Sequence, residues 1–235
     1  MKINAFTMAE VLITLGIIGV VAAMILPALM NNHRNKALEA GLKRSYSVLS
    51  QALDMYYAQT GEKLTSETIG NHEMKLILMK YLNVVYDCGL GSDDVNKACI
   101  PNTGNSGFED NGQKINKYRN YTNKSDIIMT NFDDGQFVLN DGSLILLENY
   151  SAGSPKRLYV SVDINGFHKN PNRMGYDPFM FQVDDKGRLL PMGAEGTAYY
   201  SKTNGYCSPT STSGQNGFGC TYNALTDKFY FKNLH

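Results

Sequence analysis

The sequence lacks the usual signs of an enzyme or of a nucleic-acid-binding protein. Its four histidines are scattered, and no Ser or Cys nucleophile motif lies near them. The glycine-rich strings GLGSDD and GAEG do not stand between a strand and a helix, where a phosphate-binding loop lies. With 22 Lys and Arg against 22 Asp and Glu, the formal net charge is zero, so nothing in the charge favours nucleic acid as an obligate partner. We therefore expect no catalytic site and no nucleic-acid partner.

Zinc-binding patterns are missing as well. None of the four cysteines forms a C-x-x-C pair, and no histidine stands at metal-ligand spacing from them. An even number of cysteines in two local, loop-like stretches favours disulfides and an oxidising compartment. Four cysteines allow three connectivities. Because each pair is embedded in one glycine-rich loop, we favour Cys88–Cys99 and Cys207–Cys220; four free thiols in a cytosolic protein are the alternative.

The apolar residues are concentrated near the N-terminus. A length of 235 residues fits one domain with an appended segment, or two small domains, and 43% hydrophobic residues is enough for a packed core. Residues 6–30 read FTMAEVLITLGIIGVVAAMILPALM, in which Glu10 is the only ionisable residue. About 20 apolar residues cross a bilayer as a helix, so this run is long enough to span one.

Two ordinary explanations of the run leave something unexplained. A signal peptide has a basic start, an apolar stretch of about 7–15 residues and a small-residue cleavage site. Here the apolar run is longer and no clear cleavage site follows it. A plain membrane anchor accounts for the length but not for Glu10, because a charge at the bilayer centre costs about 2.5–3.5 kcal/mol on insertion scales. Intramembrane charges usually mark a function, the alternative being a Glu that reaches back to the headgroups.

The residues around Glu10 resemble a known processing motif. The string AFTMAEVLITLGIIGVVAA at positions 5–23 is similar to the cleavage and methylation motif of type IV prepilins and type II secretion pseudopilins. The resemblance implies that prepilin peptidase cuts between Ala5 and Phe6, that Phe6 becomes N-methylated, and that Glu10 serves assembly. The family usually has Gly where Ala5 stands, and Leu-Ile where Met8 and Ala9 stand.

Simple electrostatics gives that motif a physical meaning. Cleavage would create an α-amine at Phe6, which is largely cationic at neutral pH and can pair with the Glu10 carboxylate. In the family, the amine comes from a neighbouring subunit, so that both charges are buried only in the correct register. Gly19 and Ala23 form a small-xxx-small pair that lets helices approach closely, and Pro27 stands where the family commonly bends this helix. The implied partners are identical or related subunits, an inner-membrane assembly platform and membrane lipid.

Helical spacing continues beyond the apolar run. Leucines and tyrosines recur every three or four residues, which predicts an amphipathic helix ending at Gly61; they are Leu38, Leu42, Tyr46, Leu49, Leu53 and Tyr57. We therefore divide the chain into a leader (1–5), a transmembrane assembly helix (6–30), its amphipathic continuation (31–60) and a globular head (61–235).

The head should combine one short helix with an antiparallel sheet. Residues 73–85 have the pattern of a helix. Apolar runs separated by turn residues then predict a strand meander, with strands at 127–132, 136–140, 143–150, 157–164, 179–183 and 188–191. The fold class is therefore α+β, a long N-terminal helix packed on an antiparallel sheet, and the resemblance implies the ladle shape of pilins.

One loop of the head has the composition of a calcium site. Residues 162–179 supply Asp163, Asn165 and Asp177 around Gly and Pro. Calcium takes six to eight oxygen ligands, which Asp, Asn and loop carbonyls provide. Some major pseudopilins bind calcium in a C-terminal loop, although no EF-hand pattern is present here. The alternative is turn chemistry, in which Asp and Asn bond their own backbone.

Together these features predict a structural subunit of a type IV pilus-like or type II secretion pseudopilus filament. The expected location is the inner membrane, with a single span and a periplasmic or extracellular head. Arg34, Lys36, Lys43 and Arg44 after the span argue for the opposite topology, but long domains translocate largely regardless of charge. The alternative function is a membrane-anchored extracytoplasmic binding protein that does not polymerise.

Overall fold

The computed structural model describes residues 7–89, 99–100, 109–110, 113–114, 118–149, 158–202 and 205–234. The chain divides into two units, residues 1–37 and residues 38–235, and each is described by itself. We call the second the head unit. Its N-terminal boundary lies inside helix α1 (Met8–Thr60), so the second half of that helix belongs to the head unit.

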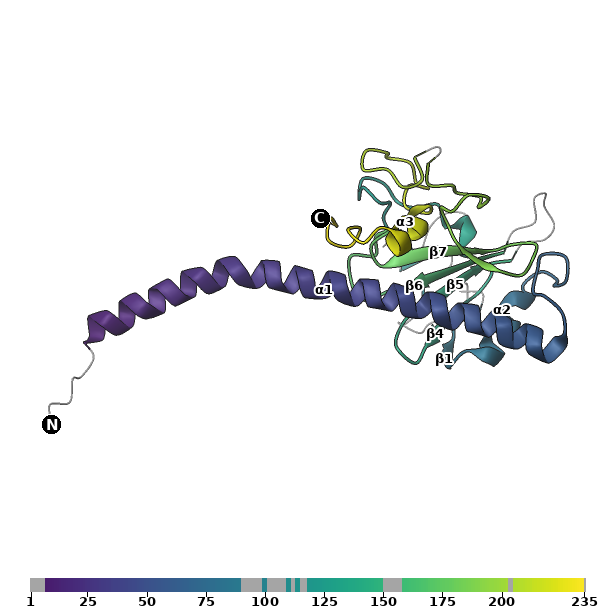
Figure 1. Cartoon of the computed structure of the whole chain (residues 1–235), viewed down its shortest axis with the longest axis horizontal. Coiled ribbons are helices and arrows are strands. Elements are labelled where there is room, and N and C mark those ends of the chain that lie inside the picture. The colour runs from purple at the N-terminus through teal and green to yellow at the C-terminus, as the bar shows by residue number, and fades with distance from the viewer. Residues whose placement is uncertain are drawn as a thin grey trace. The chain divides into compact units, whose positions relative to one another are not determined.

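The described part of the first unit is the N-terminal part of α1, which is apolar up to Met30 and which Figure 1 draws in purple. Among the described residues, this is the one helix long and apolar enough to cross a membrane, and its most apolar window has no buried residue. Pro27 lies inside the helix, where it removes one backbone hydrogen-bond donor. The segment expected to span the membrane is therefore a helix whose apolar side chains are exposed.

The second half of α1 packs through the predicted stripe. Leu38, Leu42, Leu49 and Leu53 are buried, Tyr46 is half-buried, and Tyr57 is exposed. The helix ends at Thr60, and Gly61 then adopts a φ of +75° while its N–H donates to the Tyr57 carbonyl at 2.8 Å. Glycine adopts this left-handed conformation without steric cost. The predicted helix end is confirmed.

A six-stranded antiparallel sheet forms the centre of the head unit. Its strand order is β1-β4-β5-β6-β7-β8, so the strands lie in chain order, and β1 is next to β4 because β2 and β3 belong to another sheet. The strands are β1 (Val84–Asp87), β4 (Gln136–Leu139), β5 (Leu144–Glu148), β6 (Tyr159–Asp163), β7 (Pro178–Val183) and β8 (Leu189–Pro191). A separate two-stranded sheet pairs β2 (Glu109–Asp110) with β3 (Gln113–Lys114).

Both faces of this sheet are covered. On one face, Phe137, Val160 and Phe181 join the leucines of α1 in one buried cluster. On the other face, Leu146, Tyr159 and Met180 pack with loop residues such as Tyr118 and Phe218. Consequently every residue of β4, β5 and β6 is buried. The α+β class predicted from sequence is confirmed (Figure 1).

Several predicted elements differ from the structure. The helix expected over 73–85 ends earlier: α2 is Glu73–Tyr81, and the chain then enters strand β1. Residues 127–132 do not form a strand, and their only regular element is the 3₁₀ helix η2 (Met129–Asn131). A short helix, α3 (Cys220–Thr226), lies in the C-terminal part of the head, where no element was predicted from sequence. In the first case, pairing of β1 with β4 overrides the local apolar pattern.

Candidate functional site

The first turn of α1 contains a capping box centred on Glu10. The Glu10 carboxylate oxygen Oε2 accepts hydrogen bonds from the Thr7 backbone N–H at 2.8 Å and from the Thr7 hydroxyl at 2.9 Å. In return, the Glu10 N–H donates to Thr7 Oγ1 at 3.3 Å. Thr at the cap with Glu three residues later satisfies donors that have no partner within the helix. The expected cleavage and methylation residues, Ala5 and Phe6, lie outside the described residues.

The helix surface beyond this turn is open and apolar. Large side chains from Met8 to Met30 are exposed, with Met8 at 81% and Met24 at 74%. A Cβ added at Gly16 or Gly19 would meet no atom within 4 Å. Such a surface is unstable in water and is accommodated by lipid or by neighbouring apolar helices.

The three predicted calcium ligands come together at one end of the sheet. Asp163 ends β6 and is paired with Pro178 of β7, directly after Asp177. The Asn165 side chain lies near enough to the Asp177 carboxylate to lower its pKa against the larger effect of burial. Both aspartates are fully buried. Three polar residues of the segment 162–179 therefore lie together in the fold.

Each carboxylate of this cluster is held by hydrogen-bond donors. The Tyr118 hydroxyl donates to Asp163 Oδ2 at 2.6 Å, and the Gly166 N–H donates to Asp163 Oδ1 at 3.0 Å. The backbone N–H groups of Asn172 and Arg173 donate to the two oxygens of Asp177, each at 2.8 Å. These bonds fix both carboxylates in one orientation.

Burial makes this pair costly to ionise. Burial, with the Asp177 charge as a second cause, raises the pKa of Asp163 to about 7, against the donated hydrogen bonds that favour its anion. Burial likewise raises the pKa of Asp177 to about 6, opposed by the hydrogen bonds from Arg173 and Asn172. Burial also raises the pKa of the Tyr118 phenol well above its usual value, so this group acts as a neutral donor.

Two amide oxygens beside the carboxylates have no hydrogen-bond partner. They are Asn165 Oδ1 and Asn172 Oδ1, both shielded from solvent. The described residues contain no cluster of three or more His, Cys, Asp and Glu side chains that could hold a metal ion. The oxygen donors of these four residues are two carboxylates and two amide groups. All-oxygen donors of this kind suit calcium rather than zinc or copper.

The cysteines pair locally in the structure. Cys88 bonds Cys99, with their Cα atoms 5.7 Å apart, and Cys207 bonds Cys220, with theirs 4.9 Å apart. The first disulfide lies beside β1, and the second ties the tail to the start of α3. This is the connectivity favoured from sequence, and no free cysteine remains.

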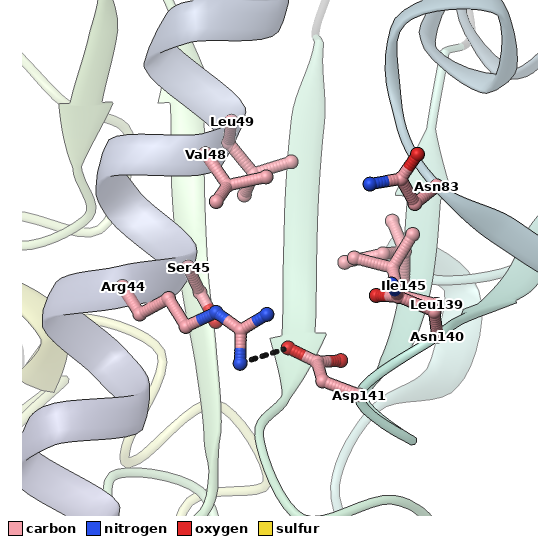
Figure 2. Close-up of a pocket in the computed structure, with 9 residues that line it drawn as sticks. All are labelled: Arg44, Ser45, Val48, Leu49, Asn83, Leu139, Asn140, Asp141 and Ile145. Carbon is pink, nitrogen blue, oxygen red and sulfur yellow. Dashed lines mark ion pairs between the residues drawn. The ribbon is translucent and has the colours of Figure 1, made fainter.

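A small cavity lies between α1 and the turn that joins β4 to β5 (Figure 2). Its volume is about 60 Å³. The Arg44 guanidinium spans one side and pairs with the Asp141 carboxylate at 3.3 Å, while Val48, Leu49 and Ile145 supply apolar walls. Small-molecule sites usually measure several hundred Å³, so we do not assign this cavity as a ligand site.

Sequence reasoning missed three residues of these sites. The Thr7 cap follows a T-x-x-E pattern that can be recognised from sequence. Asn172 lies inside the segment already singled out. Tyr118 stands 45 residues before the aspartate that it contacts, and nothing local announces that contact.

No family model, curated protein or solved structure matches this chain.

Proposed function

We propose that this protein is a structural subunit of a type IV pilus-like or type II secretion pseudopilus filament. In this proposal prepilin peptidase removes residues 1–5, and the subunit assembles through α1 with identical or related subunits at an inner-membrane platform. Its role is structural rather than catalytic. The observation that carries the proposal is an acid, Glu10, in the first turn of the exposed and otherwise apolar part of α1 that ends at Met30, one turn from the expected new N-terminus.

The charge balance of that turn supports assembly rather than simple anchoring. The Glu10 carboxylate accepts two hydrogen bonds from Thr7. These bonds lower the cost of placing the acid near a bilayer but do not neutralise it. A methylated amine at Phe6 would be cationic, so bundled helices would contain as many such cations as Glu10 anions. A plain anchor has no use for this arrangement.

Two substitutions separate the cap from the charge. Glu10→Gln keeps a side chain that can accept the Thr7 hydrogen bonds, since Gln also serves in capping boxes, but it removes the charge. Thr7→Val removes the hydroxyl of the cap and keeps the charge. If Glu10 acts through its charge, Glu10→Gln should abolish filaments, and Thr7→Val should reduce them less. Filaments are measured by shearing after expression with the cognate peptidase and platform.

The matched control is Glu39→Gln. Glu39 lies on the same helix beyond the apolar run and forms an ion pair with Lys43. Exposed pairs of this kind contribute about 0–1 kcal/mol, so filament yield should stay at the wild-type level. Wild-type filament yield from Glu10→Gln, as the only subunit of its kind, would contradict the assembly role.

The alternative, a membrane-anchored binding protein, predicts a different outcome. It requires insertion but neither processing nor polymerisation. The wild type and all three variants should then insert equally and keep an intact N-terminus. None of the four proteins should form filaments. The head would carry the function, and the filament assay would not respond to Glu10.

We also propose that the cluster of Asp163, Asn165 and Asp177 binds calcium, which would stabilise the head. The unpartnered oxygens of Asn165 and Asn172 beside two buried carboxylates support this. A bound dication would offset the cost of ionising both aspartates and would give the amide oxygens a partner. The remaining ligands would be loop carbonyls or water.

A further inference from the structure

The C-terminal segment of the head unit presents an aromatic side chain between two lysines. Phe229 is 48% exposed. The Nζ atoms of Lys228 and Lys232 lie 4.9 and 5.4 Å from the centre of its ring. Neither lysine forms an ion pair with another residue in the described part of the chain. We call Lys228, Phe229 and Lys232 the basic–aromatic patch.

The exposure of Phe229 is imposed by a rigid segment and does not reflect a loose tail. The Phe229 N–H donates to Asp227 Oδ1 at 2.8 Å, and the Lys232 N–H donates to the Phe229 carbonyl at 3.1 Å. The next two residues are buried: the Tyr230 hydroxyl donates to the Gly175 carbonyl at 2.7 Å, and Phe231 packs on Phe179 with ring centres 6.0 Å apart. The fold therefore holds Phe229 outward.

The basic–aromatic patch lies at the end of the head unit where α1 enters. A Cβ added at Gly41, near the start of the buried stripe, would overlap Ile164, the residue after β6. Phe179 lies in the same end of the sheet, because it pairs with Val162, and Phe231 packs on Phe179. The opposite end of the sheet carries the β7–β8 turn, where a Cβ added at Gly187 would come within 2.9 Å of Lys63, just beyond the end of α1.

Chain length ties this end of the head unit to the membrane surface. Residues 31–37 separate the last residue of the apolar run from Leu38, the first residue of the head unit. A helix of seven residues is about 10 Å long. If the apolar run is inserted, the entry end of the head unit stays close to the headgroups whatever orientation the head takes.

The charges at this end favour an anionic surface. Lys43 and Arg44 are paired with Glu39 and Asp141. The exposed Lys169 belongs to the loop after Ile164 and adds to the two lysines of the patch. Among the described residues, these lysines have no salt-bridge partner. Lysine near an anionic bilayer contributes about 1 kcal/mol, and an aromatic ring buries apolar area at the headgroup level.

We propose that the basic–aromatic patch rests on anionic lipid headgroups while the subunit is inserted in the membrane and not yet assembled. This proposal rests on the membrane insertion that the proposed function requires, but not on polymerisation. The lipid contact fixes which face of the head meets the bilayer and is released when the subunit leaves the membrane.

The absence of tryptophan provides a direct test. The chain has none, so Phe229→Trp gives a single fluorescent reporter. The full-length variant is reconstituted in phosphatidylcholine vesicles with and without phosphatidylglycerol. Tyr57→Trp is the matched control, because Tyr57 is 44% exposed, lies under the Lys63 ammonium at 3.7 Å, and is at the far end of α1.

The proposal predicts that phosphatidylglycerol shifts the Phe229→Trp emission to shorter wavelength and makes it quenchable by brominated lipid, with no change for Tyr57→Trp. When Lys228→Gln and Lys232→Gln are added to the Phe229→Trp variant, the ratio of lipid-bound to lipid-free patch should fall on the order of fivefold for each lysine removed.

Two results would overturn the proposal. One is the same emission from both reporters in both lipids. The other is a shift that ignores phosphatidylglycerol and grows with the ratio of protein to lipid, because it would place a second copy on the patch. Carbonate extraction of the wild-type chain serves as the insertion control. Release by carbonate would contradict membrane insertion, and with it the proposed function as well.

Discussion

The Glu10 carboxylate caps the first turn of its own helix, and in the proposed function it also pairs with a neighbouring subunit. Its carboxylate accepts two hydrogen bonds from Thr7 in the first turn of α1. Asp163 and Asp177 are in a comparable position, since donors hold them in place while burial opposes their charge. Each of these acids has a local structural role, and each carboxylate could also bind a positively charged group. The partner we propose is an amine for Glu10 and calcium for the aspartates.

The pKa values of the aspartate pair predict how stability depends on pH. Both folded-state pKa values, about 7 for Asp163 and about 6 for Asp177, lie above the ordinary value of 3.8. The folded head therefore binds protons more tightly than the unfolded chain does. The resulting stability is full below about pH 4 and is lost as pH rises through 6 to 7, by about 1.4 kcal/mol per unit of pKa difference.

The measurement is urea unfolding of the full chain in detergent with chelator, followed from pH 5 to pH 8. The midpoint should fall across this range, and Asp163→Asn, which resembles the protonated acid, should flatten the fall. The hydrogen-bond donors of the cluster, namely the Tyr118 hydroxyl and the backbone N–H groups of Asn172 and Arg173, are the same in the wild type and in Asp163→Asn. A midpoint that rises with pH would contradict this account of the pair.

Calcium should remove that pH dependence. A ligand bound only to the folded state stabilises it by RT ln(1 + [L]/Kd), about 2.7 kcal/mol at a hundredfold excess over Kd. At pH 8, millimolar calcium should raise the unfolding midpoint of the wild type but not that of Asp177→Asn. Equal midpoints with chelator and with calcium would leave turn chemistry as the explanation of this cluster.

At the scale of elements, sequence predicted best where one face of an element is buried by its immediate neighbours. The stripe from Leu38 to Leu53 and the runs that became β4 to β8 have the period of their final structure. Residues 84 and 85 were assigned to a helix because the strand character of β1 depends on pairing with β4, which is some fifty residues away in the chain. The contact of Tyr118 with Asp163 was hidden for the same reason.

The packing of α1 on the sheet makes Gly41 a sensitive position. In a free helix, Gly→Ala would stabilise by about 1 kcal/mol. At Gly41 the added methyl group would overlap the branched side chain of Ile164, so Gly41→Ala should destabilise the head by about 1–3 kcal/mol.

Ile164→Ala should restore part of that loss when combined with Gly41→Ala, which a double-mutant cycle from urea unfolding measures. Gly16→Ala is the matched control, because a Cβ there meets no atom within 4 Å. Additive effects of the two substitutions would show that the contact between helix and sheet is looser than the structure indicates.

The second disulfide should matter more for the tail than for the sheet. Cys207–Cys220 closes a separation of 13 residues and anchors the start of α3. The chain-entropy model gives about 3 kcal/mol for a loop of this size. Cys207→Ser with Cys220→Ser should therefore lower the unfolding free energy by about 2–4 kcal/mol and increase protease cutting between the two positions. Unchanged cutting would show that the surrounding contacts suffice.

At the scale of the whole molecule, the chain combines two units with opposite solvent requirements. The apolar half of α1 exposes large hydrophobic side chains along its whole length, while the head unit has a covered sheet and two disulfides. The first unit is suited to lipid or to a bundle of like helices, and the second to an oxidising aqueous compartment. The length of the apolar run and the local cysteine pairing can both be recognised from sequence, whereas the boundary between the units inside α1, after Ala37, was not predicted.

The mature N-terminus tests the proposed function most directly. Full-length protein is expressed with its cognate peptidase, purified from the membrane fraction and digested, and the N-terminal peptide is identified by mass spectrometry. The proposal predicts a peptide that begins at an N-methylated Phe6, and an uncut precursor from the Ala5→Leu variant. An intact Met1 in the wild type, or a new N-terminus beyond residue 30, would contradict it.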